Sequence, residues 1–111
     1  MNELESLIAE EDNLEKATKA LKAMAHPLRL KVLCVLNTEE MSVLDIVSQV
    51  GSSQSNISQH IDILRSKGIV ASRRVGNKVF CRVKDERVLA MVATMKNLFC
   101  DNGGVVSSNN L

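Results

Sequence analysis

Residues 42–68 read SVLDIVSQVGSSQSNISQHIDILRSKG, and this stretch decides the fold. Ser42 is suited to accept a hydrogen bond from the first turn of a helix, and Asp45 follows it at the spacing of a capping box. Apolar side chains then recur at helical spacing until Gly51, a residue type that favours the end of a helix. A second helix is predicted over about residues 54–67. Two helices joined by a short turn that contains glycine are typical of a helix-turn-helix.

After this stretch, the hydrophobic period changes from that of a helix to that of a strand. Residues 69–74 and 79–83 are strand-like, and residues 75–78 between them suit the tip of a β-hairpin. A hairpin directly after a helix-turn-helix is a wing. The sequence therefore predicts a winged helix-turn-helix, a mainly α fold with a small β-hairpin (α+β).

Further helices are predicted on the N-terminal side of this unit. One covers about residues 11–25, and Leu4, Leu7 and Ile8 could extend it toward the N-terminus. Pro27 suits the first position of the next helix, because that position needs no backbone N–H.

A last helix is predicted over about residues 85–99, and it is apolar nearly all round. One of its surfaces should pack on its own domain and another on a partner, for which a second copy of the chain is the economical choice. We therefore expect a homodimer. The predicted domain comprises residues 13–100. It follows an N-terminal extension, residues 1–12, and precedes a tail, residues 101–111, whose loop composition predicts disorder.

Positive charge is concentrated in one third of the chain. The whole sequence carries 14 Lys and Arg against 13 Asp and Glu. Residues 1–50 nevertheless sum to −4, residues 51–84 to +6 and the remainder to −1. A basic segment of this kind suits a polyanion, although a solvated basic face would have the same composition.

The helix predicted over residues 54–67 has a buried side and a small polar side. Ile57, Ile61 and Leu64 fall on one side of a helical wheel, and mainly Ser and Gln side chains fall opposite. Gln can pair with adenine and Ser with base edges or phosphates, and a recognition helix reads bases with its N-terminal part. An ordinary solvent-facing helix is the alternative. The sequence predicts contacts to double-stranded DNA from Gln54, Ser55, Ser58, Gln59, Arg65, Arg73, Arg74 and Lys78.

Several classes of protein and of site do not fit this composition. Only Phe80 and Phe99 are aromatic, which leaves no set of stacking platforms for single-stranded nucleic acid. Three scattered cysteines and two histidines predict neither a disulfide scaffold nor a bound metal, and nothing points to another cofactor. The chain has no glycine-rich phosphate loop or carboxylate pair, so we expect no enzyme. Without a long apolar run or a basic signal segment, we expect a cytoplasmic protein with no membrane partner.

The chain resembles the ArsR/SmtB family of winged-helix repressors in three stretches that occur in order at family spacing. These are LKAMAHPLRL at residues 21–30, SQSNISQHIDILR at residues 53–65 and GIV at residues 68–70. The resemblance covers roughly residues 13–100. It implies a homodimer built on the first and last helices, which represses transcription until an inducer weakens its binding to operator DNA. It also implies that the DNA-contacting positions are Gln54, Ser55, Ser58, Gln59 and His60.

His60 has a second interpretation. On the helical wheel it lies on the flank of the buried side. A core histidine that is bonded to the neighbouring helix is therefore as good an interpretation as a base contact.

The resemblance does not extend to the metal sensors of this family. Residues 42–47 lack the cysteine pair of the thiolate-type sensors, and the last predicted helix has no histidine for an interfacial zinc site. Asp45 alone is better explained as a helix cap. We therefore expect no metal.

The cysteines resemble those of a different subgroup. Residues 30–36, LKVLCVL, and residues 98–100, LFC, resemble the sulfide- and persulfide-responsive SqrR and BigR regulators and the HlyU-like regulators. This resemblance implies that an oxidant or a reactive sulfur species links Cys34 to Cys100 through a disulfide or polysulfide bridge. The link would release the operator.

The residues themselves leave the thiol chemistry open. Lys31 precedes Cys34 by one helical turn and Lys96 precedes Cys100 by one turn, which favours each thiolate, whereas the predicted helix C-termini disfavour negative charge. Cys34 and Cys81 could also be small buried core residues. Two other functions remain as alternatives. One is a regulator of the same fold without a thiol switch, such as an HlyU-like anti-repressor, and the other is a helical interaction module that does not bind DNA.

Overall fold

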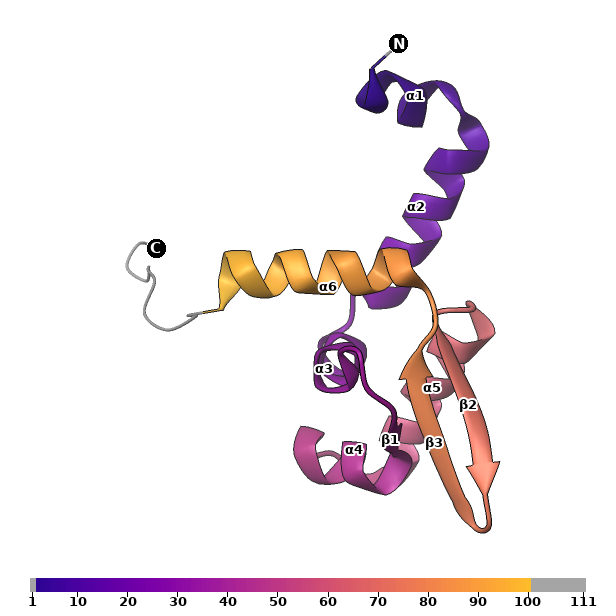
Figure 1. Ribbon diagram of the computed structural model, residues 1–111, viewed down its shortest axis with the longest axis vertical. Coiled ribbons are helices and arrows are strands. Elements are labelled where there is room, and N and C mark those ends of the chain that lie inside the picture. Colours follow the sequence, from indigo (N-terminus) through magenta and orange to yellow (C-terminus); the bar gives the residue numbers. More distant parts are fainter. Residues whose placement is uncertain (1, 101–111) are drawn as a thin grey trace.

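The computed structural model describes residues 2–100, except the side chains of residues 7–9. The order of the helices and strands confirms the predicted mainly α fold with a β-hairpin. The tail predicted to be disordered, residues 101–111, lies outside the described residues. The helices are α1 (Glu3–Ala9), α2 (Glu11–Met24), α3 (Pro27–Leu36), α4 (Val43–Val50), α5 (Gln54–Ser66) and α6 (Glu86–Phe99), and the strands are β1 (Met41–Ser42), β2 (Val70–Val75) and β3 (Lys78–Val83) (Figure 1).

Helices α4 and α5 form the predicted helix-turn-helix. The hydroxyl of Ser42 accepts a hydrogen bond from the backbone N–H of Asp45 (3.1 Å), and Gly51 ends α4 in the left-handed conformation with φ of 84°. Ser53 caps α5 in the same way through the N–H of Asn56, also at 3.1 Å. The capping box predicted at Ser42 is only half formed in the described chain, where the Asp45 carboxylate makes no return bond. Ser42 belongs to strand β1 as well, so its backbone takes part in the sheet.

Strands β2 and β3 form the wing. Val75 pairs with Lys78, so Gly76 and Asn77 alone make the turn, which is shorter than the predicted tip. Gly76 has φ of 63°, a value that a type II′ hairpin turn requires at its first central position. The sequence-based prediction missed strand β1, which pairs with the other edge of β3 and gives the order β1-β3-β2. A strand of two residues is too short to show an alternating pattern.

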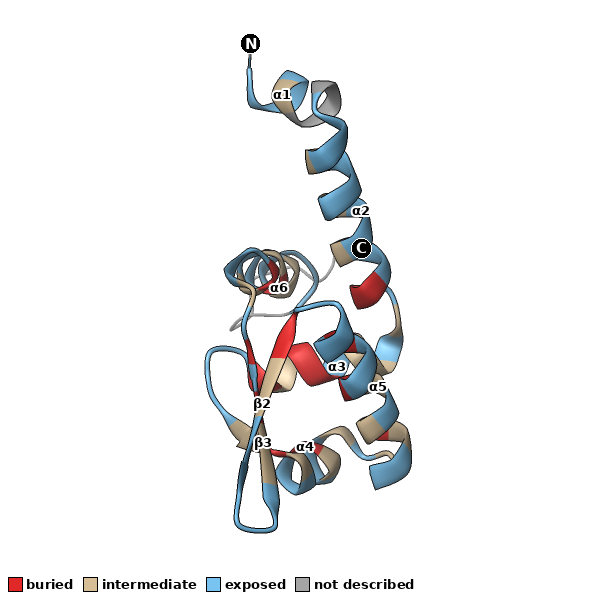
Figure 2. Cartoon of the chain, turned by 90° about the vertical axis from the view of Figure 1, so that its right-hand side faces the viewer, coloured by how far each residue is buried: buried red, intermediate tan, exposed pale blue. Residues whose placement is uncertain are grey.

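The core lies where α3, α4, α5 and α6 meet the strands (Figure 2). Ile57, Ile61 and Leu64, which the helical wheel predicted to face inward from α5, are all buried. The hairpin alternates as predicted, with Cys81 buried and Arg82 exposed in β3. The other fully enclosed side chains include Val32, Leu33, Leu36, Ile46, Ile69, Val70, Val88 and Val92.

Helices α1 and α2 extend away from this core (Figures 1 and 2). Residues 3–9 form a helix of their own and do not extend α2, because the backbone of Glu10 is extended (φ −101°, ψ 104°). In α2 only the last two residues are buried, and Leu14 and Leu21 are 45% and 56% exposed. The apolar face of α2 therefore has little to pack against within the described chain.

Candidate nucleic-acid interface

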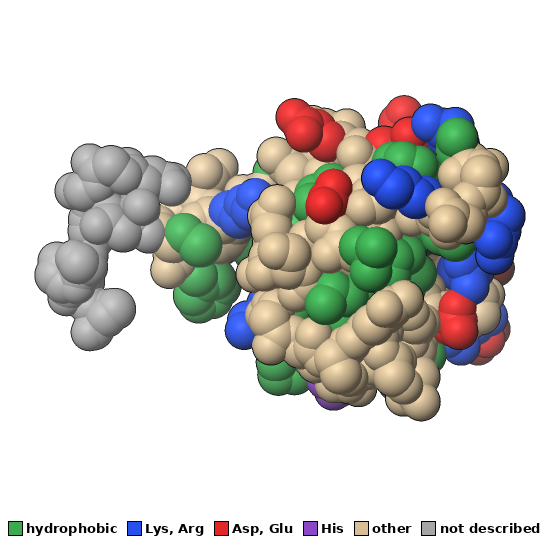
Figure 3. All heavy atoms as spheres, turned by 90° about the horizontal axis from the view of Figure 1, so that it is seen from below, with side chains coloured by type: hydrophobic (Ala, Val, Ile, Leu, Met, Phe, Trp, Pro, Cys, Tyr) green, Lys and Arg blue, Asp and Glu red, His purple; other side chains and the backbone are tan. Residues whose placement is uncertain are grey.

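The polar side of α5 faces outward at the end of the molecule formed by α4, α5 and the wing. Gln54, Ser55 and Gln59 are exposed there, and Ser58 is half-buried. Seen from that end, much of the surface consists of backbone and of side chains that are neither charged nor hydrophobic, around a small hydrophobic patch, and most of the visible Lys and Arg side chains lie toward one edge (Figure 3). The face offers groups suited to base edges and, beside them, groups suited to phosphates.

A cavity of about 370 Å³ lies between α5 and the wing. Its lining includes three cations and one carboxylate, that of Asp62. The structure thus brings together residues that the sequence had predicted separately from two elements. The predicted DNA-binding residues that line this cavity are Gln54, Ser58, Arg65, Arg74 and Lys78.

Arg73 does not line this cavity, and its guanidinium is paired with another residue of the chain. Its Nε and Nη2 donate to the two carboxylate oxygens of Glu40 at 2.8 and 2.7 Å, and its guanidinium lies 5.5 Å from the centre of the Phe80 ring. The hydrogen bonds from Arg73 hold the pKa of the Glu40 carboxyl below its usual range. Glu40 is not among the residues predicted from the sequence, because a residue 33 positions before Arg73 gives no local sign that it will pair with the wing.

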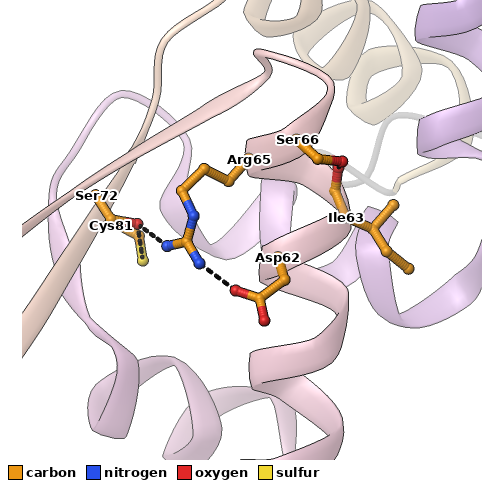
Figure 4. Close-up of polar contacts among 6 residues, drawn as sticks. All are labelled: Asp62, Ile63, Arg65, Ser66, Ser72 and Cys81. Carbon is orange, nitrogen blue, oxygen red and sulfur yellow. Dashed lines mark hydrogen bonds and ion pairs between the residues drawn. The ribbon is translucent and has the colours of Figure 1, made fainter.

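Arg65 is also bonded to other residues of the chain. It donates from Nη1 to the hydroxyl of Ser72 in β2 at 2.8 Å, and it forms an ion pair with Asp62, one turn earlier on α5 (Figure 4). The Ser72 hydroxyl in turn lies 3.4 Å from the sulfur of Cys81. Burial raises the pKa of this thiol, and the contact with Ser72 lowers it.

His60 contacts α3, and its side chain is half-buried. Arg29 approaches Nδ1 of His60 with Nη1 at 3.3 Å, and the ring centres of His60 and His26 are 4.3 Å apart. Because arginine only donates, this nitrogen of His60 must be the acceptor. Burial, His26 and Arg29 all lower the pKa of His60, which favours the neutral ring. These contacts favour the interpretation of His60 as a histidine bonded to the neighbouring helix.

Cys34 lies near the end of α3 and Cys100 follows the last residue of α6, and the two thiols are close enough for their charges to interact. Cys34 is half-buried and Cys100 is exposed. Burial raises the pKa of the Cys34 thiol, the ammonium group of Lys96 lowers it, and the proximity of Cys100 raises it. The sequence had placed Lys96 beside Cys100, but the structure directs its Nζ to the carbonyl oxygen of Cys34, at 3.2 Å.

Two further findings concern the described chain as a whole. Among residues 2–100, no three His, Cys, Asp or Glu side chains gather where they could share a metal ion. No described helix combines the length and apolar character that are needed to cross a membrane. The lack of a metal stays a prediction.

Sequence comparison finds relatives that match most of the chain. Residues 26–72 match the family described as "Bacterial regulatory protein, arsR family". The HTH-type transcriptional regulator YgaV of Escherichia coli K12 is 38% identical over 101 residues, which cover 90% of this chain and 99% of the relative. The transcriptional activator HlyU of Vibrio cholerae is 40% identical over 90 residues, which cover 81% of this chain and 83% of the relative.

Solved structures of relatives share the fold. HlyU from Vibrio cholerae N16961 gives a TM-score of 0.79 at 40% identity, over 82% of this chain and 99% of that chain. The transcriptional repressor BigR from Xylella fastidiosa gives a TM-score of 0.78 at 32% identity, over 83% of this chain and 94% of that chain. The relatives are transcription regulators and not enzymes. The chain with this winged helix-turn-helix therefore belongs to the arsR family of bacterial regulatory proteins.

Proposed function

We propose that the chain binds double-stranded operator DNA as a homodimer and represses transcription. The observation that carries this proposal is the gathering of α5 polar groups and wing cations around one cavity, on a face that is open to a large ligand. Helix α5, the recognition helix of this proposal, would enter the major groove with its N-terminal end, and the wing would lie along the backbone. A relative named biofilm growth-associated repressor, from Xylella fastidiosa, supports repression.

Activation or anti-repression is the second candidate. HlyU, named a transcriptional activator, is 40% identical to this chain. Transcription in vitro from a promoter that overlaps the selected operator separates the two candidates. A repressor lowers transcript yield in the absence of any other regulator, whereas an anti-repressor changes the yield only when a competing repressor is present.

Within the interface, Ser55 and Gln59 are proposed to read bases, while Arg74 and Lys78 hold phosphates. All four side chains are exposed, and none of them forms an ion pair with another described residue. Gln59 lies one helical turn after Ser55, so both project from the same side of the N-terminal half of α5. The two cations lie on the wing strands beyond the body of the domain.

Gln59→Ala should weaken binding to the operator by about 1–3 kcal/mol and leave binding to random duplex nearly unchanged, because only the operator complex contains a base contact. Arg74→Ala is the matched control. It should weaken binding to both duplexes and flatten the slope of log affinity against log salt by about one unit, as expected for one lost phosphate contact. Fluorescence anisotropy with an operator selected from random DNA, at several salt concentrations, measures both effects.

Two results would contradict this assignment at different levels. Equal losses of Gln59→Ala on operator and random duplex would remove Gln59 from base reading. A wild-type affinity for duplex that does not respond to salt would contradict the proposed DNA binding itself.

The proposed homodimer uses α2 and α6. An apolar groove of about 460 Å³ lies between these helices and α3, and its lining includes Leu21, Met91 and Met95. Leu98 and Phe99, at the end of α6, are 71% and 83% exposed. Exposed apolar surface of this extent is typical of a protein interface. A twofold axis through it would present two recognition helices to half-sites about 34–36 Å apart.

We further propose that a link between Cys34 and Cys100 releases the operator. A persulfide, R–S–SH, would first meet the exposed Cys100, whose thiolate attacks the outer sulfur, so that RS⁻ leaves and Cys100 carries S–SH. The thiolate of Cys34 would then attack Sγ of Cys100, so that an S–S bond joins the two cysteines and the outer sulfur leaves as HS⁻. The two thiols are thereby oxidised to a disulfide, and the persulfide is reduced to RSH and hydrogen sulfide. A solved relative named "Reduced HlyU" supports a role for the redox state in this family.

The link would reach the DNA-binding face through α3. Cys34 lies on α3, which contacts α5 through Arg29 and His60. In the reduced chain, Lys96 already holds the end of α6 to the carbonyl of Cys34. A covalent link would replace this adjustable contact and shift α3 under α5. Release follows only from the difference in DNA affinity between the reduced and linked states.

Persulfide treatment should lower the operator affinity of the wild type by about 5–150-fold, the range of typical allosteric coupling. Cys34→Ser and Cys100→Ser should abolish the response, while Cys81→Ser, the matched control at a buried cysteine, should keep it. Because burial raises the pKa of Cys34, disulfide formation should speed up as the pH rises and more thiolate forms. Anisotropy measures the affinity, and peptide mapping identifies the linked cysteines. If both single variants still release DNA, this pair is not the sensor.

A further inference from the structure

We propose that Arg65 is a positioning residue that fixes the wing against the recognition helix, a role that rests on the proposed DNA binding. Arg65 lies near the C-terminal end of α5, and its guanidinium uses two nitrogens at once (Figure 4). Nη1 donates to the hydroxyl of Ser72 in β2 at 2.8 Å, and Nη2 pairs with the carboxylate of Asp62. One side chain therefore joins the two elements that are proposed to touch DNA.

This contact is made where the wing leaves the body of the domain. Along β2, burial falls from Val70, which is buried, through half-buried residues 71–72 to Arg73 and its successors, which are exposed. Ser72 pairs with Cys81 in β3, and Cys81 is buried. Ser72 is thus the last position in β2 that the body of the domain covers. The hydrogen bond from Arg65 to Ser72 therefore sets the direction of β2 beyond Ser72.

The charges around Arg65 favour this role over a phosphate contact. The side chains of Arg65 and Asp62 are 45% and 62% exposed, so the pair faces the region that DNA would occupy. A phosphate that captured Arg65 would leave the Asp62 carboxylate unpaired beside a polyanion. Arg74 and Lys78 have no carboxylate partner among the residues described. We therefore assign phosphate binding to Arg74 and Lys78, and the orientation of the wing to Arg65.

The test uses the difference between arginine and lysine. Arg65→Lys keeps the positive charge, so a phosphate contact would survive in large part. A single ammonium group cannot bond Ser72 and Asp62 with the geometry of the planar guanidinium. Amide hydrogen exchange of the free protein is the deciding measurement, since it does not depend on DNA. We expect exchange at residues 73–79 to rise in Arg65→Lys and in Ser72→Ala, and to stay unchanged in the matched control Arg74→Ala.

Operator binding supplies a second readout. Arg65→Lys and Ser72→Ala should each lower affinity on the order of tenfold, and the double variant should lose no more than the weaker-binding single variant, because both changes break one link. Unchanged exchange at residues 73–79 in Arg65→Lys would overturn the proposal and return Arg65 to the phosphate contacts. If the wild type did not bind duplex, the proposed function would fail, whereas the exchange result would still decide whether Arg65 holds the wing.

Discussion

Leu21→Asp is expected to turn the proposed dimer into a monomer and to weaken operator binding by about 10²–10⁴-fold, the gain that two linked binding sites provide. Leu21 is 56% exposed, so the core of one protomer does not depend on it. In the dimer, the groove that it lines with Met91 and Met95 would be covered. An unpaired carboxylate buried there costs on the order of several kcal/mol. Each protomer should therefore keep its fold while the dimer is lost.

Light scattering after size-exclusion chromatography measures the oligomeric state, and anisotropy with a two-half-site operator measures the affinity. Lys19→Asp is the matched control, because Lys19 is exposed on the other side of α2 from Leu21. This control should remain a dimer. A Leu21→Asp chain that still ran as a dimer would place the interface elsewhere on the surface.

Leu64→Ala should lower the free energy of unfolding by about 2–5 kcal/mol, the usual cost of such a truncation in a core. Leu64 is 0% exposed and belongs to the same buried cluster as Ile57 and Ile61, the other inward residues of α5. Its removal leaves a cavity under the recognition helix. The substitution should therefore lower the stability of the protein and at the same time loosen the packing of α5 against the core.

Urea denaturation at a fixed protomer concentration measures this effect, because unfolding of a dimer depends on concentration. Ile63→Ala is the matched control, since Ile63 is the preceding residue on the same helix and is 37% exposed. Its loss should stay below that of Leu64→Ala. Equal losses of unfolding free energy in the two variants would mean that α5 does not pack against the core through Leu64.

The elements that the sequence predicted well are those with local signals. A serine precedes each of the helices α4 and α5, and a glycine follows α4. In α5 the apolar side chains recur at helical spacing and form one side of the helix. The wing has alternation and a glycine in its turn. Strand β1 and the break at Glu10 lack such signals, since two residues show no period and the break depends on one extended residue.

The candidate interface was predictable in its composition but not in its pairings. The helical wheel correctly separated Ser55 and Gln59 from the buried side of α5. The charge of residues 51–84 counts Arg65 and Arg73 as available cations, whereas both are paired in the structure. The partner of Arg73, Glu40, belongs to another element, so only the tertiary fold shows that this charge is already neutralised. Lys96 likewise makes a contact that only the tertiary fold shows, because its Nζ donates to the backbone carbonyl of Cys34 on another helix.

In the proposed dimer, helix α2 would link the lifetime of the protein in a cell to its abundance. Only its last two residues are buried, and a helix of 14 residues without a partner is marginal in water. A protomer that has lost its proposed partner would therefore open this segment often, and a protease cleaves opened segments in proportion to their population. Because protomers pair more completely as their concentration rises, each molecule would last longer when the protein is plentiful. Scarce copies would be degraded first, so the regulator would respond to its own dilution as a growing cell divides.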